Sequence, residues 1–209
     1  IMASRKKVVV TGFEPFGEHD VNASWVAVQE LERLGLDETF DLYVCEVPVE
    51  YQAVQSLLPV LWKEHGPQLV VHVGVSGTAT TVTLEQCGHN KGYTRLDNCS
   101  FCPASQCCME SGPDCLKSVL DMETVCKRVN ESSLGVTLSV SKDAGRYLCD
   151  YTYYTSLHLG HGRCAFIHVP PLDKPYSSRD LGRALQAAIL EMLKQLEPDH
   201  SQGDRCNNG

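Results

Sequence analysis

Short apolar runs alternate along the chain with segments in which apolar residues recur at helical spacing. The strand-like runs cover residues 7–10, 42–47, 68–73, 82–85, 136–140 and 165–169. The helical spacing covers residues 21–34, 50–64, 147–159 and 178–196. Strands that alternate with helices favour a mainly parallel sheet with helices on both faces. The pattern therefore predicts an α/β protein, a three-layer α/β/α sandwich around a mostly parallel, twisted central sheet.

Three segments allow more specific predictions of local structure. Residues 68–73 (QLVVHV) are nearly all apolar, as expected of a strand that helices cover on both faces. Residues 82–85 alternate, so Glu85 falls on the polar face of a half-buried strand. Residues 91–112 are irregular and rich in Cys, Gly and Pro, which predicts a long excursion from the sheet.

The length of 209 residues is typical of one domain. We expect residues 1–197 to form that single domain, and the polar residues 198–209 to form a disordered tail. Hydrophobic residues make up 43% and charged residues 21%, which are the proportions of a globular protein. The oligomeric state is left open by these features, with a monomer favoured.

The charge and the apolar runs exclude several classes of partner. The formal charge is −8 and the basic residues are scattered, which argues against nucleic acid. No run approaches the roughly 18 apolar residues of a membrane span, and the first residues lack the pattern of a signal peptide. We therefore expect a cytoplasmic protein whose eleven cysteines are reduced thiols. The glycosylation patterns at Asn22, Asn98 and Asn130 would then remain unused.

Cys149 stands out among the cysteines by its placement. It follows a predicted strand and the small-residue turn Ala144-Gly145, and it lies in the first turns of the predicted helix 147–159. At a helix N-terminus, the dipole and the free backbone N–H groups favour a thiolate. The same N–H groups can hold an oxyanion. The alternative is a buried structural cysteine.

A nucleophilic thiol needs a base within hydrogen-bond reach. Among eight histidines, His168 is the best placed because it ends a predicted strand, where the functional crevice of an open α/β sheet lies. Cys149 and His168 are expected to bracket one helix of a βαβ unit and to meet at that edge. Glu85, at the end of its own strand, would orient the imidazole, and Asp143 and Asp150 are alternatives by proximity.

The other histidines have weaker claims. His72 lies inside an apolar strand, which predicts a core histidine with satisfied hydrogen bonds. The remaining ones that we considered as bases have no comparable setting; they are His19, His65, His89 and His200.

Two sets of residues offer metal ligands. One set is Cys99, Cys102, Cys107 and Cys108; the other is His158, His161, Cys164 and His168. Structural zinc usually joins two well-spaced pairs of ligands. The four cysteines of the first set lie too close together in the sequence to form two such pairs. The second set includes His168, which is better explained as a base. We therefore expect no metal and no organic cofactor.

Six motifs resemble the cytosolic pyroglutamyl-peptidase family, in the order in which that family carries them. They are VTGFEPFG (10–17), NASW (22–25), VVHVGVSG (70–77), VTLEQCGHN (82–90), SKDAGRYLCDYTYY (141–154) and FIHVPP (166–171). The resemblance runs from about Lys6 to about Leu196, and the segment around Cys99–Cys108 is similar to vertebrate members. It implies a cysteine exopeptidase that removes an N-terminal pyroglutamyl residue from small peptides through a thioester acyl-enzyme.

The resemblance also implies roles for particular residues. Glu85, Cys149 and His168 would form the catalytic triad. The residues that would bind the substrate are Phe13 and Phe16 as walls of the pocket, the backbone near Val75 as partner of the lactam amide, Leu148, and Arg95. Aromatic walls and a few backbone hydrogen bonds suit a small, flat and uncharged lactam.

The sequence departs from the family at Gln86, where many members have Lys or Arg, and at Gly88, where many have Ala. Neither change removes a catalytic group, but both could alter how Glu85 is held. The alternative hypothesis is a catalytically weak relative that binds metal or acts as a thiol-redox or binding protein. The pair Cys99–Cys102 is a poor redox candidate because it lies in an irregular segment rather than at a helix start.

Overall fold

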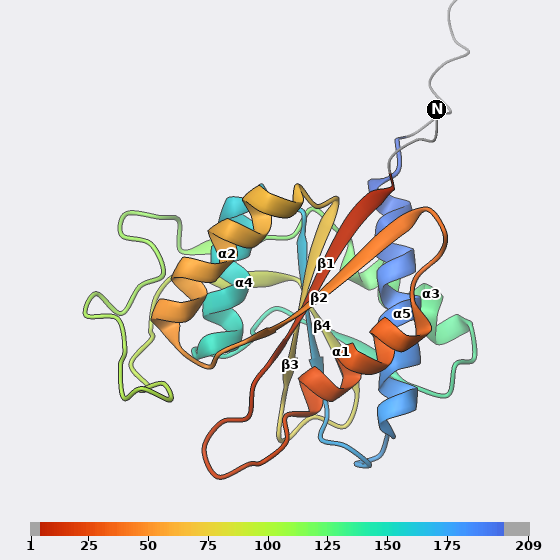
Figure 1. Ribbon diagram of the computed structural model, residues 1–209, viewed down its shortest axis with the longest axis horizontal. Coiled ribbons are helices and arrows are strands. Elements are labelled where there is room, and N and C mark those ends of the chain that lie inside the picture. Colours follow the sequence, from red (N-terminus) through yellow and green to blue (C-terminus); the bar gives the residue numbers. More distant parts are fainter. Residues whose placement is uncertain (1–4, 199–209) are drawn as a thin grey trace, which may run out of the picture.

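The computed structural model describes residues 5–198 and consists of a central sheet between two layers of helices (Figure 1). In chain order the elements are β1 (Lys6–Phe13), α1 (Ala23–Leu34), β2 (Phe40–Val47), α2 (Tyr51–His65), β3 (Leu69–Val75), β4 (Val82–Glu85), β5 (Cys87–His89), β6 (Cys115–Lys117), α3 (Met122–Glu131), β7 (Leu138–Ser141), α4 (Leu148–Leu159), β8 (Cys164–Val169) and α5 (Ser178–Leu196). The predicted disordered tail, residues 198–209, lies outside the described residues except for Pro198.

The main sheet has the strand order β2-β1-β3-β8-β4-β7, and β5 pairs with β6 in a separate two-stranded sheet. Neighbouring strands of the main sheet are parallel, except that β4 runs antiparallel to β8. Helices α1, α3 and α5 cover one face and helices α2 and α4 the other (Figure 1). The predicted three-layer sandwich with a mostly parallel sheet is confirmed.

Strand β8 shows how the two layers hold the sheet. Its residues Ala165, Ile167 and Val169 are fully buried in the cluster that includes α1 and α5. Cys164 and Phe166 are equally buried in the cluster that includes α2 and α4. A strand that is covered on both faces needs apolar residues at nearly every position, which explains the continuous apolar run of the sequence. Each such side chain stabilises the fold by roughly 1.5–3 kcal/mol relative to exposure.

The end of β1 is fixed by the start of α1. The Asn22 side chain caps the helix by accepting the N–H of Ser24 at 3.0 Å. The Ser24 hydroxyl in turn accepts the N–H of Phe13 at 3.0 Å. At Gly12 a Cβ atom would lie 2.8 Å from the Cα of Trp25, so only glycine lets helix and strand approach this closely. These contacts set the position of Phe13.

One expectation about the topology is wrong, and three elements were not predicted. The predicted βαβ unit around α4 does not form, because β7 runs antiparallel to β8 and β4 lies between them. The sequence pattern also missed α3 and the short pair β5 and β6. The irregular excursion at residues 91–112 is confirmed; its one isolated bridge joins Lys91 to Cys107.

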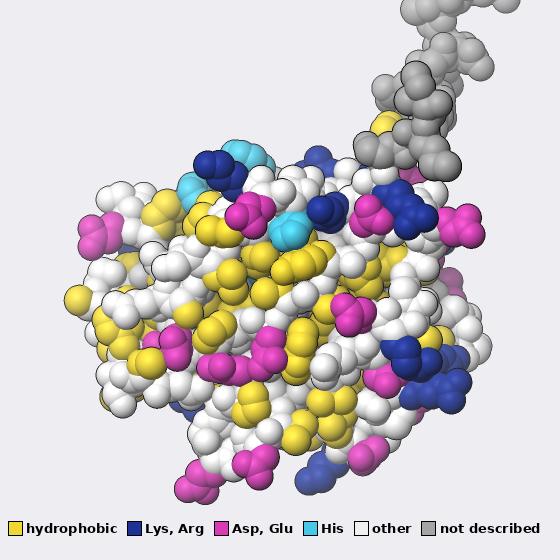
Figure 2. Space-filling view, viewed as in Figure 1, with side chains coloured by type: hydrophobic (Ala, Val, Ile, Leu, Met, Phe, Trp, Pro, Cys, Tyr) yellow, Lys and Arg dark blue, Asp and Glu magenta, His cyan; other side chains and the backbone are white. Residues whose placement is uncertain are grey.

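Strand β2 forms one edge of the sheet. Figure 2 shows hydrophobic side chains across this face between α1 and α2, interrupted by acidic side chains. Tyr43 on β2 is 42% exposed and its ring stacks on that of His65. Charged groups along an edge strand hinder pairing with another chain. Within residues 5–198, none of the helices combines the length and hydropathy that a bilayer crossing requires.

His72 on β3 is a core histidine, as the sequence predicts. It is fully buried, and its two ring nitrogens contact the hydroxyl oxygens of Thr11 and Ser156, each at 2.6 Å. Burial lowers the pKa of His72 from 6.5 to about 3, because the charged imidazolium would lose its hydration. His72 therefore joins β1, β3 and α4 as a neutral hydrogen-bonding group.

This neutral histidine predicts a specific acid sensitivity. As the pH falls below about 6.5, the unfolded state takes up a proton at His72 while the folded state does not until about pH 3. The stability that His72 contributes is therefore present above pH 6.5 and is lost progressively towards pH 3. We expect the free energy of unfolding, measured by urea denaturation, to fall more steeply between pH 6 and 4 in the wild type than in His72→Gln. Protonation of wild-type His72 near pH 6, followed by NMR, would contradict the prediction.

Candidate active site

Cys149 is the second residue of α4, and Tyr147 is the N-terminal capping position. The half-buried thiol thus lies at the first turn of the helix, as predicted from the sequence. The first N–H groups of a helix have no partner within it and remain free to bind an anion. Helix α4 packs on β3 and β8, so its N-terminus brings the thiol to the sheet.

Gly74 on β3 determines how close the thiol comes to the sheet. A Cβ atom at this position would lie only 2.6 Å from the Cys149 sulfur and 2.8 Å from Cζ of Phe166. Gly74 is also the β3 partner of His168 in the register of β3 and β8. The sulfur therefore lies over the strand position next to His168. Sequence reasoning missed this role, although a glycine inside an apolar strand indicates close approach of another group.

A loop carries the chain from β7 to this position. Because β7 is antiparallel to β8, its last residue Ser141 pairs with Glu85, which itself pairs with Phe166 in the middle of β8. Residues 142–147 must therefore return towards the end of β8 before α4 begins. Asp143 shapes this turn by accepting the N–H of Gly145 at 3.0 Å.

His168 on β8 contacts Glu85 on β4, with 2.9 Å between Nδ1 and Oε1. Both side chains are buried, His168 being 8% exposed and Glu85 3%. In the antiparallel pair of β4 and β8, Thr83 lies opposite His168, so Glu85 occupies the diagonal position on the same face. The structure thus brings the two predicted residues together. The expected reason, that both sit at matching carboxyl ends of strands, is wrong.

The electrostatic surroundings favour a charged imidazole. Burial alone would lower the pKa of His168. The neighbouring Cys149 and Glu85 raise it by more than burial lowers it, and the resulting pKa is about 10. Because Nδ1 faces Glu85, Nε2 is the ring nitrogen that remains for Cys149, whose proximity contributes to the raised pKa. The second carboxylate oxygen of Glu85, Oε2, is buried and has no hydrogen-bond partner among the described residues.

The two alternative carboxylates take other partners. Asp143 is exposed and pairs with Arg146 at 2.9 Å. Asp150 accepts hydrogen bonds from the Tyr93 hydroxyl at 2.6 Å and from the backbone N–H of His89 at 3.2 Å. Glu85 is therefore the carboxylate that contacts His168.

A cavity of about 560 Å³ opens beside the thiol. Every site residue predicted from the sequence lines it: Phe13, Phe16, Val75, Glu85, Arg95, Leu148, Cys149 and His168. Further lining residues were not predicted, among them Asn22, Ser76, Ser141, Arg146 and Tyr147. This volume lies within the range of small-molecule sites.

The irregular segment 91–112 supplies Arg95 to the cavity. The Arg95 guanidinium lies over the ring of Tyr147, 4.2 Å from its centroid. The Arg95 carbonyl accepts the hydroxyl of Tyr51 on α2 at 2.8 Å, and the Leu96 carbonyl accepts that of Tyr147 at 3.0 Å. The segment is thereby fastened both to α2 and to the residue that precedes α4.

The metal-ligand sets considered from the sequence do not form in the described part of the chain. The side chains that come together there are Cys87, His89 and Cys115, which lie outside the cavity. What the cavity offers is a thiol, a buried base in contact with it, and a carboxylate behind the base. Such an arrangement can carry out nucleophilic attack and proton transfer.

Comparison with known proteins agrees with this chemistry. Residues 6–183 match the protein family described as pyroglutamyl peptidase. The chain is 66% identical over 203 residues to pyroglutamyl-peptidase 1 of Homo sapiens, a match that covers 97% of each protein. It is 34% identical over 194 residues to a pyrrolidone-carboxylate peptidase of Thermococcus onnurineus, covering 87% of this chain and 94% of that protein.

Solved structures with a similar fold come from related proteins. A mutant pyrrolidone carboxyl peptidase from the hyperthermophile Pyrococcus furiosus superposes with a TM-score of 0.83 at 25% identity, covering 91% of this chain and 100% of that one. Pyroglutamyl peptidase I from Bacillus amyloliquefaciens gives a TM-score of 0.80 at 25% identity, covering 92% and 99%.

The contact at Gly74 predicts that substitutions of Gly74 and of the nearby Gly77 have unequal effects. In Gly74→Ala the added methyl group must displace the Cys149 sulfur or Phe166, whereas at Gly77, which lines the cavity, nothing lies within 4 Å of a Cβ atom. We expect Gly74→Ala to lower the free energy of unfolding by about 1–3 kcal/mol and to slow alkylation of Cys149 by iodoacetamide. Gly77→Ala should change the free energy of unfolding by less than about 0.5 kcal/mol. Equal effects of the two substitutions in denaturation and alkylation experiments would contradict the packing argument.

Proposed function

Because this chain belongs to the pyroglutamyl peptidase family, we propose that it is a cysteine exopeptidase that removes an N-terminal pyroglutamyl residue from small peptides. The observation that carries the proposal is His168, buried between Glu85 and Cys149 at the wall of the cavity. A thiol, a base and an orienting carboxylate in this order are the parts that acyl transfer through a cysteine requires.

The cavity suits a neutral ring. Phe13 and Phe16 offer apolar surface, and the backbone at Val75 offers peptide groups to the lactam amide. Leu148 and Arg95 complete the proposed contacts, with Leu148 buried beside the nucleophile and Arg95 at the exposed rim. A pyroglutamyl residue carries no ammonium group, so no carboxylate is needed to bind one.

In the proposed reaction, the Cys149 sulfur attacks the carbonyl carbon of the pyroglutamyl residue after its proton has passed to His168. The carbonyl oxygen becomes an oxyanion, which the N–H groups at the first turn of α4 stabilise. The C–N bond then breaks, and the imidazolium gives its proton to the departing amine. The raised pKa of His168 keeps this proton available at neutral pH.

Water completes the cycle. His168 takes a proton from water, which attacks the thioester and releases pyroglutamate, and the proton returns to the Cys149 sulfur. Glu85 fixes the imidazole through Nδ1 during both steps and stabilises its charged form. No step needs a metal ion or an organic cofactor.

The alternative of a catalytically weak relative is less well supported. It requires that one of the three groups be lost or displaced. The departures at Gln86 and Gly88 leave Glu85 in contact with His168. Gln86 instead donates its side-chain amide to the carbonyl of Leu120 at 2.8 Å, and Gly88 packs against the backbone of Tyr154.

We propose the cytoplasm as the location and the monomer as the working state. The ten cysteines within residues 5–198 are all unpaired, which suits a reducing compartment. The net charge of −8 favours peptides over nucleic acid as partners.

One prediction of the proposed function concerns the nucleophile. Cys149→Ser should lower kcat for release of a dye from a pyroglutamyl amide by at least about 10³-fold, because the hydroxyl is a far weaker nucleophile here. Cys99→Ser, which changes an exposed thiol, is the matched control and should retain wild-type kcat. Prolyl and alanyl amides should be poor substrates, and a chelator should not alter the rate. Substantial turnover by Cys149→Ser would refute the assignment of the nucleophile.

Another prediction of the proposed function concerns the pocket wall. Phe16→Ala should raise KM for the pyroglutamyl amide about tenfold, since a lost aromatic contact of about 1.4 kcal/mol corresponds to that factor. Phe13→Ala should act in the same direction, although Phe13 is 3% exposed and its loss will also destabilise the fold. Val60→Ala, on the exposed side of α2, is the control. An unchanged KM for both phenylalanine variants would remove these residues from the pocket.

A further inference from the structure

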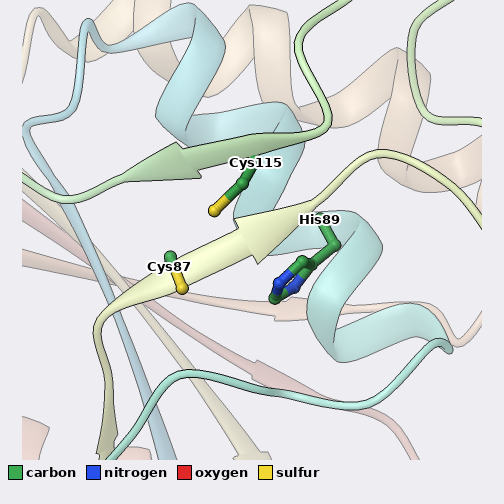
Figure 3. Close-up of side chains that lie close together, drawn as sticks. All are labelled: Cys87, His89 and Cys115. Carbon is green, nitrogen blue, oxygen red and sulfur yellow. The ribbon is translucent and has the colours of Figure 1, made fainter.

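A second group of thiol and imidazole side chains lies outside the catalytic cavity. The potential ligand atoms of Cys87, His89 and Cys115 all lie within 4.8 Å of one another. Cys87 and His89 come from β5 and Cys115 from β6, and Figure 3 shows the three side chains on the same side of this pair of strands. None of the three lines the cavity beside Cys149.

The ladder between β5 and β6 explains why the side chains converge. His89 lies directly opposite Cys115 in the antiparallel register. Cys87 precedes His89 by two residues, so it points to the same face of the strand pair and is the diagonal neighbour of Cys115. The cluster is therefore built into regular backbone pairing rather than formed by flexible loops.

We propose that Cys87, His89 and Cys115 bind one Zn²⁺ ion and leave its fourth coordination position open. Zinc prefers thiolate and imidazole ligands in tetrahedral geometry. Zn–S bonds of about 2.3 Å place two sulfurs of a tetrahedron about 3.8 Å apart, so small side-chain rotations close the site. Two thiolates balance the charge of the ion, which matters because Cys87 is buried. Cys115 is exposed, and solvent or a further ligand can reach the fourth position.

The position of Asp150 next to His89 supports the proposed zinc site. Its Oδ1 lies 3.5 Å from Nδ1 of His89, and Oδ2 accepts the backbone N–H of the same residue at 3.2 Å. Within the described residues, Nδ1 of His89 is buried and has no hydrogen-bond partner. Metal-binding histidines usually direct one ring nitrogen at a carboxylate, which leaves the other to bind the metal. A proton on Nδ1, facing Asp150, would leave Nε2 as the ligand atom.

A disulfide is the competing use of the two thiols, and the ladder disfavours it. Diagonal neighbours in an antiparallel pair have Cα atoms roughly 7–8 Å apart, whereas disulfides rarely span more than about 6.8 Å. The Cys87 thiol instead donates to the carbonyl of Lys142 at 3.2 Å. Lys142 belongs to the loop that leads from β7 to α4. A bound ion would thus connect β5 and β6 with the loop before the nucleophile.

The test uses cobalt as a spectroscopic substitute for zinc in full-length protein. Cys149→Ser serves as the background, so that the catalytic thiol cannot contribute, and the protein is first stripped with a chelator. We expect about one equivalent of Co²⁺ to produce thiolate-to-cobalt charge-transfer absorption that Zn²⁺ removes. Zn²⁺ should also raise the Tm of this variant by about 3 °C or more, because the ion binds only the folded state.

The matched variants add Cys115→Ser or Cys99→Ser to this background, both changing exposed cysteines. Cys115→Ser should weaken Co²⁺ binding at least tenfold and abolish the Tm shift, and His89→Ala should do the same. Cys99→Ser should leave both readouts unchanged.

Absorption and Tm shifts that survive in both Cys115→Ser and His89→Ala would overturn the proposal. So would their absence in the Cys149→Ser background, or a Cys87–Cys115 disulfide in protein that binds no metal when reduced. Because these readouts do not use turnover, their failure leaves the proposed peptidase activity untouched.

Discussion

The contact between the Cys149 sulfur and the backbone at Gly74 is the constraint on which the site depends. Helix α4 can bring its N-terminus this close to β3 only because the strand has no side chain at that point. The same register places His168 beside Gly74 on the neighbouring strand. One missing Cβ therefore sets both the depth of the thiol and its distance from the base. The aromatic ring of Phe166 also occupies the space next to Gly74, since its Cζ would lie 2.8 Å from a Cβ atom there.

The base is positioned by the packing of the whole sheet. In β8, alternation sends Ala165 and Ile167 into one layer and directs His168 to the side of α4, so the apolar core fixes the direction of the imidazole. Burying a carboxylate and an imidazole is unfavourable unless the two groups compensate each other. Glu85 and His168 do so through the 2.9 Å contact, and Cys149 and Glu85 together raise the pKa of His168. The neighbouring Cys149 and Glu85 thus favour the charged form of the base, against the opposing effect of burial.

The sequence predicted the elements better than their directions. The apolar periodicity located β8 and α4 to within a residue, because both bury nearly every position and their ends coincide with turns. The spacing of apolar residues does not say in which direction a strand runs. The antiparallel direction of β4 and β7 relative to the other strands was therefore not predicted, and Glu85 was assigned to His168 for the wrong geometric reason. Strands β5 and β6 contain three residues each, too few for a period to emerge. No feature of the sequence marked His89 as a possible ligand, because Cys115 lies next to it only through the pairing of β5 with β6.

The chain arranges thiol, imidazole and carboxylate groups in two different geometries, and the geometry decides the chemistry. Around His168 the groups form a line, with Glu85 on one ring nitrogen and Cys149 on the other, so a proton can move along it. Around His89 the thiols converge on one point while Asp150 lies behind the ring, an arrangement that offers sulfur and nitrogen ligands to one cation. The two clusters are joined by short covalent links, since Glu85 is two residues from Cys87 and Asp150 follows Cys149. The residues of the two clusters are therefore close neighbours along the chain, although they do not share a site.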